Sequence, residues 1–369
     1  LSWCIVVAQP KIVVPPSRTY GESGEAPAGP VHVWLQGSWR KRSSDKPNME
    51  NHSLEILESD RGGSRTSPPQ DAAPLTSRGD AGLSQPEVIL RGRPAKLPKA
   101  SRAVATIFCA QSDGWSSKGN LIEHCDGVSD RATTLLRDLL RPGIRVLDLG
   151  AGVGKVAENV LGAEPTAKLT LVDHAPGMVR NLRERFKGKH QVRILQADLH
   201  TVAEALSDER FELITFFQVL HHLPRPGTAL RTAASLLTAG GRVVVLTVGP
   251  QHQEDIFPRT SRDGLGRRQA SAWVRLTEAS GLDIEVVRID PFSFRFRDGL
   301  AYARFLYRIG SLEKLAGYRL LTGEKLEYAL HDAALRATQA CADAVGRIVV
   351  PCEHLTLVAR RGQSPLKRR

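Results

Sequence analysis

Apolar residues in the second half of the chain fall into short runs that are separated by longer amphipathic segments. Short apolar runs between turn residues are typical of buried strands, whereas apolar residues three or four positions apart are typical of helices. Strand-like runs cover residues 146–149, 168–173 and 192–199, and residues 211–223 hold a fourth strand with its exit. Strands that alternate with helices predict βαβ units and a parallel sheet, so we expect an α/β fold.

The same pattern continues toward the C-terminus. Further strands are expected at 242–247, 281–289 and 354–359, and helices at 155–161, 228–237, 268–280 and 324–345. The last two strands are separated by a long insert, from about 291 to 351, which is rich in Phe and Tyr. We expect the insert to be partly helical and to cover a substrate pocket, although an interface or simple packing would also explain its aromatic residues.

A glycine-rich turn follows the first predicted strand. Asp148 precedes Gly150, Gly152 and Gly154, and a predicted helix begins at Lys155. Glycines allow a sharp bend and a close approach of a ligand to the backbone, and the free N–H groups of the helix start add positive potential. The spacing is one residue shorter than the dinucleotide fingerprint G-x-G-x-x-G. A pyrophosphate has no use for the carboxylate of Asp148, whereas a cationic amine does.

Two more predicted strands also end in an acid. Asp173 lies 23 residues beyond Gly150, where a βαβ fold places a carboxylate against ribose hydroxyls. Asp198 ends the third strand. Three consecutive strands that each end in an acid are a more specific pattern than one glycine loop, although Asp173 alone would also fit a helix cap or a surface acid.

These segments resemble the motifs of class I S-adenosylmethionine-dependent methyltransferases. The string from Val146 to Gly154 resembles the first motif, and the string from Val172 to Val179 resembles the second. The resemblance spans residues 105–361 and implies a Rossmann-like, seven-stranded sheet with helices on both faces, an antiparallel last strand and a helical insert between the last two strands. It is nearest to bacterial methyltransferases of small molecules, including those of quinone biosynthesis, and implies S-adenosylmethionine as co-substrate.

The resemblance also implies roles for particular residues. Met178 would pack on the adenine face, Asp198 would accept from the adenine amine, and the backbone N–H of Leu199 would reach a ring nitrogen. The full set of expected cofactor-binding residues is Asp148, Gly150, Gly152, Gly154, Asp173, Met178, Asp198, Leu199 and Gln218.

The fourth predicted strand and its exit resemble the family's fourth motif, with Glu212 in place of the usual Asp. Ligands of open α/β sheets bind beyond the carboxyl ends of the strands, so Gln218, His221 and His222 should lie near the transferable methyl group. His222, and less strongly His221, are candidate general bases, although a lone histidine is more often structural. A base is needed only if the acceptor carries a proton at the moment of attack.

The ends of the chain differ in composition from its middle. Residues 1–104 hold 12 of the 22 prolines and no Phe, which predicts a disordered extension. Residues 362–369 are expected to be a basic tail. The segment 113–124 would be a lid over the cofactor, with Trp115 as a lid aromatic or a core residue.

Composition narrows the location and the partners. The five cysteines show no C-x-x-C spacing, which predicts free thiols in a reducing compartment, hence the cytoplasm, and no metal site. No apolar run approaches a membrane span. The net charge of +12 permits nucleic-acid binding, but the arginines are scattered and not clustered, so we expect a small-molecule acceptor and no nucleic-acid partner.

Three alternatives stay open. A nucleic-acid methyltransferase would need a clustered basic surface, a nicotinamide-dependent oxidoreductase would need the longer glycine spacing, and a non-catalytic scaffold would typically have lost the glycines or the acids. The sequence predicts neither the acceptor, which could offer an O, N or C nucleophile, nor the oligomeric state.

Overall fold

The computed structural model describes residues 99–112, 124–125, 134–259 and 265–362. These residues form one mixed sheet whose strands lie in the order β1-β7-β8-β6-β5-β2-β3-β4. The strands are β1 (His124–Cys125), β2 (Arg145–Leu149), β3 (Lys168–Asp173), β4 (Val192–Gln196), β5 (Phe211–Phe217), β6 (Leu237–Val248), β7 (Leu282–Phe296) and β8 (Ile348–Arg361).

The central strands are parallel, as the alternating pattern predicted. Strand β2 pairs in parallel with β3 and β5, and β4 and β6 extend this parallel region on its two sides. Strand β8 is antiparallel to both β6 and β7, so β7 runs in the same direction as the central strands. Without β1, the strand order and the antiparallel β8 are those expected for the class I methyltransferase sheet.

Two features of the sheet were not predicted. The two-residue strand β1 pairs with β7 as an eighth, edge strand. Strands β7 and β8 are also longer than the sequence pattern indicated, and their pairing extends from Leu282↔Arg361 to Phe296↔Ile348. The predicted insert therefore begins inside a strand, and its helices occupy only the middle of the 291–351 range.

Helices cover both faces of the sheet. The helices of the described residues, including the three of the insert, are α1 (Lys99–Ala110), α4 (Lys155–Ala163), α5 (Pro176–Arg185), α6 (Val202–Ala205), the short 3-10 helix η2 (Leu220–His222), α7 (Pro226–Leu236), α8 (Ala270–Glu278), α9 (Gly299–Arg308), α10 (Ser311–Leu315) and α11 (Gly323–Cys341). Helix α1 begins at Lys99, six residues before residue 105, the expected start of the domain.

Alternating side chains of the strands pack into two hydrophobic cores, one on each face of the sheet. Leu147 and Val245 pack with α6, α7 and α8, whereas their neighbours Val146 and Val244 pack with α4 and α5. A strand places successive side chains on opposite faces, so a continuous apolar run is required in a sheet that is covered on both sides. This explains why the strands read as unbroken apolar runs.

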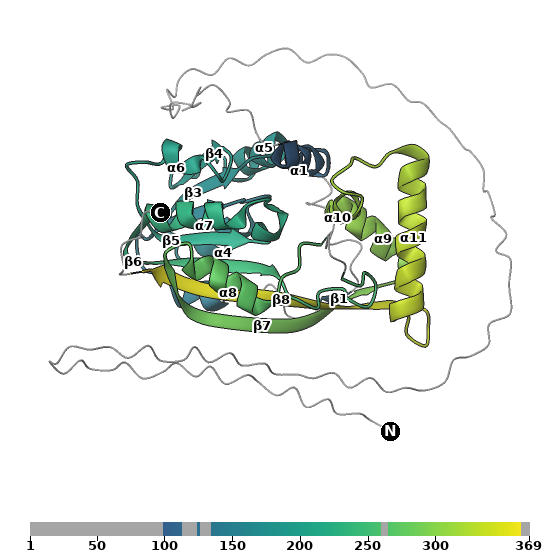
Figure 1. The fold of residues 1–369 in the computed structure, drawn as a ribbon. Helices are drawn as coiled ribbons and strands as arrows, with labels where there is room; N and C mark the ends of the chain where they lie inside the picture. The colour runs from purple at the N-terminus through teal and green to yellow at the C-terminus, as the bar shows by residue number, and fades with distance from the viewer. Residues whose placement is uncertain (1–98, 113–123, 126–133, 260–264, 363–369) are drawn as a thin grey trace, which may run out of the picture. The chain divides into compact units, whose positions relative to one another are not determined.

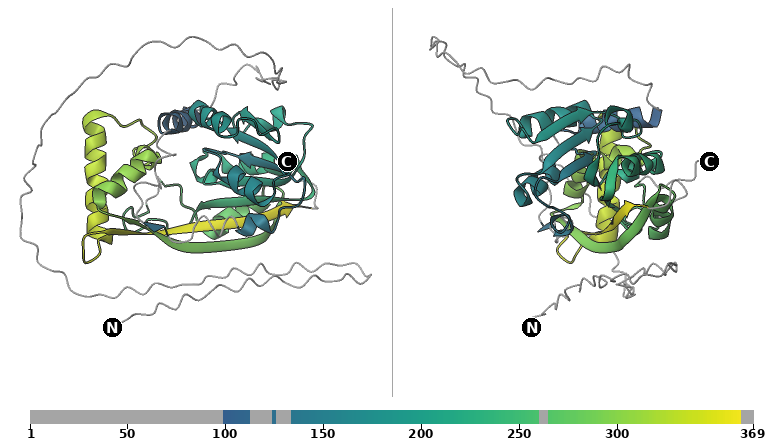
Figure 2. Two further views of the ribbon diagram at one scale, coloured as in Figure 1. Left: turned by 180° about the vertical axis from the view of Figure 1, so that it is seen from behind. Right: turned by 90° about the vertical axis from the view of Figure 1, so that its left-hand side faces the viewer.

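The insert has a core of its own. Phe296 and Tyr302 are fully buried and pack with Phe305, and Ala333 and Ala337 of α11 complete the cluster. Helices α9, α10 and α11 lie together beyond the end of the sheet to which β7 runs, in both orientations of the ribbon (Figures 1 and 2). That end is the carboxyl edge of the parallel strands, where the candidate site lies.

Candidate active site

The glycine turn after β2 needs glycine at each of its three positions. Gly150, Gly152 and Gly154 all have positive φ, at 82°, 55° and 82°. A Cβ atom on Gly150 would overlap the side chain of Val219, and one on Gly154 would overlap Phe186. A Cβ atom on Gly152 would instead meet no heavy atom nearer than 4.0 Å. The first and third glycines are therefore required by packing, whereas Gly152 leaves open the space that a ligand would enter.

Asp173, at the end of β3, fixes the glycine turn. Its Oδ2 accepts a hydrogen bond from the N–H of Gly152 at 2.8 Å, and its Oδ1 accepts one from the N–H of Ala175 at 2.9 Å. Burial raises the pKa of Asp173, and these backbone hydrogen bonds oppose that rise. Each carboxylate oxygen can accept a further hydrogen bond. The residue can therefore support the turn and still accept from a diol.

Asp148 is a buried acid with a free oxygen. The carboxyl group is 1% exposed, and its Oδ1 accepts a hydrogen bond from Oγ1 of Thr215 at 2.7 Å. Its Oδ2 is buried without a hydrogen-bond partner among the described residues. Burial raises the pKa of Asp148 to about 7, and the charge of Asp173 adds to the rise, against the opposing effect of the Thr215 bond. A cationic ligand would stabilise the ionised form, so the site fits an ammonium group.

Asp198 lies just after β4 and contacts a histidine that the sequence did not single out. Its Oδ1 accepts from the backbone N–H of His200 at 2.8 Å and lies 2.7 Å from His200 Nδ1. Burial raises the pKa of Asp198, but the hydrogen bonds from His200 outweigh it, and the net pKa lies below the ordinary value. Asp198 therefore stays ionised. Met178 and Leu199 are both buried. Met178 lies in the helix that follows Asp173, and Leu199 directly follows Asp198. Their adenine contacts stay predictions.

The exit of β5 turns abruptly at Gln218. This residue has a φ of 57°, and its N–H donates to the carbonyl oxygen of Leu246 at 2.7 Å. Positive φ at a residue other than glycine is strained and is common at functional sites. The side-chain Nε2 is buried and has no hydrogen-bond partner among the described residues. An amide donor at this place is available to a bound molecule.

Helix η2 brings both candidate histidines to the same place. The rings of His221 and His222 are 4.0 Å apart, and the ring of Phe108 contacts His222 edge-on at 4.9 Å. Nδ1 of His221 lies 3.1 Å from Oγ1 of Thr247. Nδ1 of His222 is buried and makes no hydrogen bond with any described residue. Of the two histidines, His222 is therefore the one with a ring nitrogen available to an acceptor.

Burial holds both imidazoles in the neutral form. It lowers the pKa of His221 and of His222 well below the usual value, and the positive charge of Lys314 lowers both further. A neutral imidazole can accept a proton at physiological pH, but a low pKa makes it a weak base. His222 is thus suited to accept a hydrogen bond from an acceptor or to take a proton from an acidic one.

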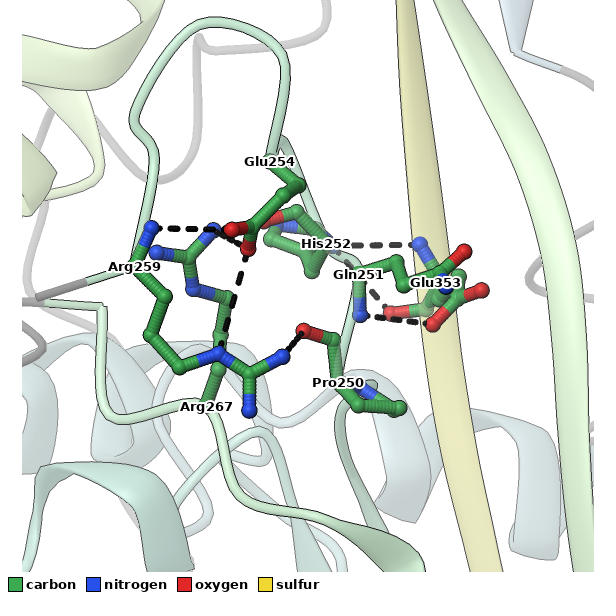
Figure 3. Close-up of polar contacts among 7 residues, drawn as sticks. All are labelled: Pro250, Gln251, His252, Glu254, Arg259, Arg267 and Glu353. Carbon is green, nitrogen blue, oxygen red and sulfur yellow. Dashed lines mark hydrogen bonds and ion pairs between the residues drawn. The ribbon is translucent and has the colours of Figure 1, made fainter. Parts of the chain in front are cut away.

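The loop between β6 and α8 is held by a network of polar contacts that was not recognised in the sequence. Glu254 pairs with Arg267 at 2.8 Å and accepts from the N–H of Arg259, while Arg259 donates to the carbonyl oxygen of Pro250 (Figure 3). Glu353 of β8 accepts from the N–H of Gln251 at 2.8 Å (Figure 3). These contacts join residues up to 102 positions apart, so no local sequence pattern could indicate them.

Two other kinds of site, a metal centre and a membrane-spanning helix, are absent from the described part of the chain. No group of three or more metal-ligating side chains is close enough there to hold a metal ion. None of its helices combines the length and apolarity that crossing a bilayer requires. Residues 113–123 of the predicted lid, including Trp115, lie outside the described residues.

The donor set at the carboxyl edge fits S-adenosylmethionine. Asp148 offers a buried carboxylate oxygen for a cationic amine, Asp173 offers lone pairs for ribose hydroxyls, and the open space at Gly152 admits a ligand close to the backbone. The individual contacts assigned to these residues stay predictions.

Comparison with known proteins agrees with this geometry. Residues 147–243 match the family described as "Methyltransferase domain". The chain is 28% identical over 144 residues to a malonyl-[acyl-carrier protein] O-methyltransferase of Paenibacillus sp., which covers 37% of this chain and 52% of the relative. It is 28% identical over 172 residues to a ubiquinone biosynthesis O-methyltransferase of Xanthomonas campestris, which covers 42% of this chain and 71% of the relative.

Similar solved structures include the [4+2]-cyclase SpnF, with a TM-score of 0.49, 18% identity, and coverage of 73% of this chain and 99% of that chain. A putative methyltransferase from Bacillus halodurans has a TM-score of 0.45 and 19% identity, and covers 64% of this chain and 100% of that chain. The matched family, the strand order and the acids at the strand ends agree. The chain carries a methyltransferase domain of the class I family, whose methyl donor is S-adenosylmethionine.

Proposed function

We propose that the protein transfers a methyl group from S-adenosylmethionine to an oxygen atom of a small-molecule acceptor. The observation that carries the proposal is the pair of buried, unpartnered nitrogens, Nε2 of Gln218 and Nδ1 of His222, at the exit of β5. A buried polar atom without a partner is costly, so a ligand or a water molecule must complete each of these two nitrogens, and a bound acceptor could do so. Both atoms lie where an open α/β sheet binds its ligands.

An oxygen nucleophile is favoured over nitrogen or carbon for two reasons. Both relatives described above are O-methyltransferases by name. In addition, an amide N–H and an imidazole together suit a hydroxyl or carboxyl group, which both accepts and donates hydrogen bonds. A malonyl thioester and a quinone precursor differ greatly in shape, so the relatives support the reaction type without identifying the acceptor.

The role of the protein in this reaction is chiefly alignment. S-Adenosylmethionine carries a methyl group on a positively charged sulfur. An oxygen lone pair can attack this methyl carbon directly, and the sulfur leaves. Gln218 and His222 would orient the acceptor oxygen toward that methyl, and such orientation alone accounts for a large part of the rate enhancement of many enzymes. His222 would also receive the proton of an acceptor that binds in its neutral form.

The insert is the element that would close the acceptor pocket. Helix α10 packs against α1, because Nε2 of Gln111 donates to Oε1 of Glu313 at 3.1 Å. The aromatic residues of the insert, in contrast, mostly pack on each other as its own core. We therefore propose that α10, and not the aromatic cluster of the insert, covers the acceptor pocket.

The decisive experiment is an acceptor screen with purified protein, in which release of S-adenosylhomocysteine is followed across alcohols, phenols, carboxylic acids, amines and nucleic acids. Methylation of a small hydroxyl or carboxyl compound is expected. A His190→Ala variant, which changes an exposed histidine, serves as a control and should behave as the original protein. Methylation of RNA or DNA would favour the nucleic-acid alternative. Cofactor binding without turnover of any class would favour the non-catalytic scaffold.

The compartment also stays a proposal. Cys109, Cys341 and Cys352 are free thiols in the described part of the chain. Free thiols persist in reducing compartments, which supports the expected cytoplasmic location.

A further inference from the structure

A histidine just beyond β4 is buried around a single side-chain contact. The side chain of His200 is 4% exposed, and its Nδ1 lies 2.7 Å from Oδ1 of Asp198. An ionised carboxylate only accepts hydrogen bonds, so Nδ1 is the donor. The other ring nitrogen, Nε2, is buried and has no hydrogen-bond partner among the described residues. The bond to Asp198 is therefore the one hydrogen bond that this ring makes within the described part of the chain.

The turn after β4 does not need this ring in order to form. The backbone N–H of His200 also donates to Oδ1 of Asp198, at 2.8 Å, and any residue other than proline would supply that bond. Leu199 and Val202 are buried and anchor the turn in the core on either side of the histidine. An apolar side chain would fill the same space without burying an unpartnered nitrogen, which is costly. The effect of the ring on the Asp198 carboxylate is what distinguishes it from such a residue.

The carboxylate that the ring contacts lies beside the expected ribose site. Strands β3 and β4 pair in parallel up to Asp173 and Gln196, and the N–H of Ala197 donates to the carbonyl oxygen of Asp173 at 3.1 Å. Asp198 follows directly after these paired residues. The base of S-adenosylmethionine is attached to its ribose, so a ribose at Asp173 brings the base toward the end of β4.

The hydrogen bonds from His200 leave one oxygen of Asp198 for a ligand. Both of them reach Oδ1, whereas Oδ2 accepts no hydrogen bond from the described residues. Burial raises the pKa of Asp198, but the hydrogen bonds and the charge of His200 outweigh this effect, so the carboxylate is ionised. Oδ2 is thus an acceptor only, and it matches the amino group of adenine, which donates hydrogen bonds.

We propose that His200 is a positioning residue that makes the methyl-donor site selective for adenine. Its ring N–H fixes the rotation of the Asp198 carboxylate, so that Oδ2 is directed at the 6-amino group of the base. Without the ring, Asp198 keeps only the backbone hydrogen bond to Oδ1 and is free to rotate, and adenine loses an oriented acceptor. The inference concerns the methyl donor, so it goes beyond the proposed function and holds for any acceptor.

Two ligands that differ only in the 6-amino group test this role. One is S-adenosylhomocysteine, and the other is its purine analogue, which carries hydrogen in place of the amino group and keeps every ring nitrogen. Calorimetry measures the dissociation constant of each ligand for the original protein and for its variants. The original protein should bind the purine analogue about tenfold or more weakly, because a hydrogen bond to a charged group is lost.

Variants at position 200 separate the roles of the two ring nitrogens. In His200→Ala the preference for adenine should largely disappear, because S-adenosylhomocysteine binds more weakly while the purine analogue binds as before. His200→Asn places an amide N–H near the position of Nδ1 and should restore most of the preference. His200→Gln places its amide near the position of Nε2 and should behave as His200→Ala. The matched control is His190→Ala, which changes an exposed histidine and should behave as the original protein.

The same measurements can overturn the inference. An undiminished preference for adenine in His200→Ala, or an equal loss of affinity for both ligands, would show that the ring only packs in the turn. If thermal unfolding shows that His200→Ala does not fold, the comparison of His200→Asn with His200→Gln still decides, and an equal preference in these two variants would overturn the role of Nδ1. Equal binding of both ligands by the original protein would remove the adenine contact altogether. The proposed methylation of an oxygen acceptor is tested separately, by the acceptor screen.

Discussion

The two halves of the carboxyl edge are built in different ways. The cofactor half consists of the ends of β2, β3 and β4, and each of its acids lies at or just beyond the end of the strand that positions it. The acceptor half consists of the β5 exit, the loop before α8 and helix α10, which meet through contacts between residues 49 to 202 positions apart. One half is thus determined by local motifs and the other by tertiary packing, and substitutions should affect them differently.

The largest effect is expected in the cofactor half, at the glycine turn. Gly150→Ala should abolish cofactor binding and lower the stability by at least about 1–3 kcal/mol, because alanine would be strained at a φ of 82° and its Cβ would overlap Val219. Thermal unfolding and calorimetry with S-adenosylhomocysteine measure the two losses.

A second substitution separates strain from overlap. Adding Val219→Ala should restore part of the stability of Gly150→Ala, because it removes the overlapping methyl groups but not the backbone strain. Gly162→Ala, in helix α4 with open space around it, is the matched control and should be neutral or slightly stabilising. Equal losses at positions 150 and 162 would contradict the packing argument.

In the acceptor half, His222→Ala should affect turnover and not cofactor affinity. If the acceptor binds with its proton, turnover should fall on the order of 10²–10⁴-fold, as expected for loss of a general base. If it binds as an anion, the loss should be smaller and should reflect orientation. The dissociation constant of S-adenosylhomocysteine should change little, since its expected contacts come from β2, β3 and β4. A large change in that constant would place His222 in the cofactor half instead.

These two halves also differ in how far the sequence could predict them. The parallel central strands, the glycine turn and the ends of β2 and β3 followed from short apolar runs and from single residues at fixed spacing. The positions of Gln218, His221 and His222 followed from the same reasoning. Lys314 and Gln111 could not be predicted as site residues in this way. Lys314 lies in a five-residue helix and Gln111 just after the distant helix α1, and neither segment carries a sequence pattern that indicates its contacts.

The lengths of the last strands show a further limit. The sequence pattern places residues 291–296 in the insert, yet β7 continues through Pro291 to Phe296. Proline is tolerated there because the strand pairs with β8 on one side, and β1 covers only two residues on the other, opposite Phe294 and Arg295. Propensity at one residue was outweighed by pairing along the whole strand.

Asp173→Ala should weaken cofactor binding about tenfold to a hundredfold, since a hydrogen bond to a charged group contributes roughly 1.5–3 kcal/mol. The structure adds that the substitution also removes the acceptor for the N–H of Gly152, so the turn should loosen. Asp173→Asn keeps an oxygen for that N–H and should retain more of the affinity. Unchanged affinity in Asp173→Ala would show that the carboxylate serves only the fold.

Asp148 predicts a pH dependence of cofactor binding. Its pKa is about 7 without ligand, and a bound ammonium group favours the ionised form, so binding below pH 7 must release a proton. Affinity should therefore fall by up to about tenfold per pH unit below 7 and stay constant above it. Calorimetry with S-adenosylhomocysteine from pH 5 to 9 measures this slope, and Asp148→Asn should remove it.

The same group has the opposite effect on the stability of the ligand-free protein. Its pKa is raised in the folded state, so folding takes up a proton between the unfolded value near 4 and the folded value of about 7. Stability should fall as pH rises through that window, by at most about 1.4 kcal/mol per pH unit, and level off above it. The unfolding free energies of the original protein and of Asp148→Asn are compared across this pH window. If they change in parallel, Asp148 is ionised throughout the window.

The smallest effect is expected from removal of residues 1–98, and the comparison with a longer deletion makes it informative. The two residues that follow α1 contact both halves of the site: a Cβ on Gly177 of α5 would come within 2.6 Å of Ser112, and Gln111 donates to Glu313 of α10. A chain that starts at residue 99 keeps all of these contacts, so its cofactor affinity and its unfolding temperature should match those of the full chain. A chain that starts at residue 113 loses them and should bind S-adenosylhomocysteine more weakly. If the shorter deletion alone already weakens binding, the proline-rich N-terminal segment contributes to the domain, and α1 is not the element that joins its two halves.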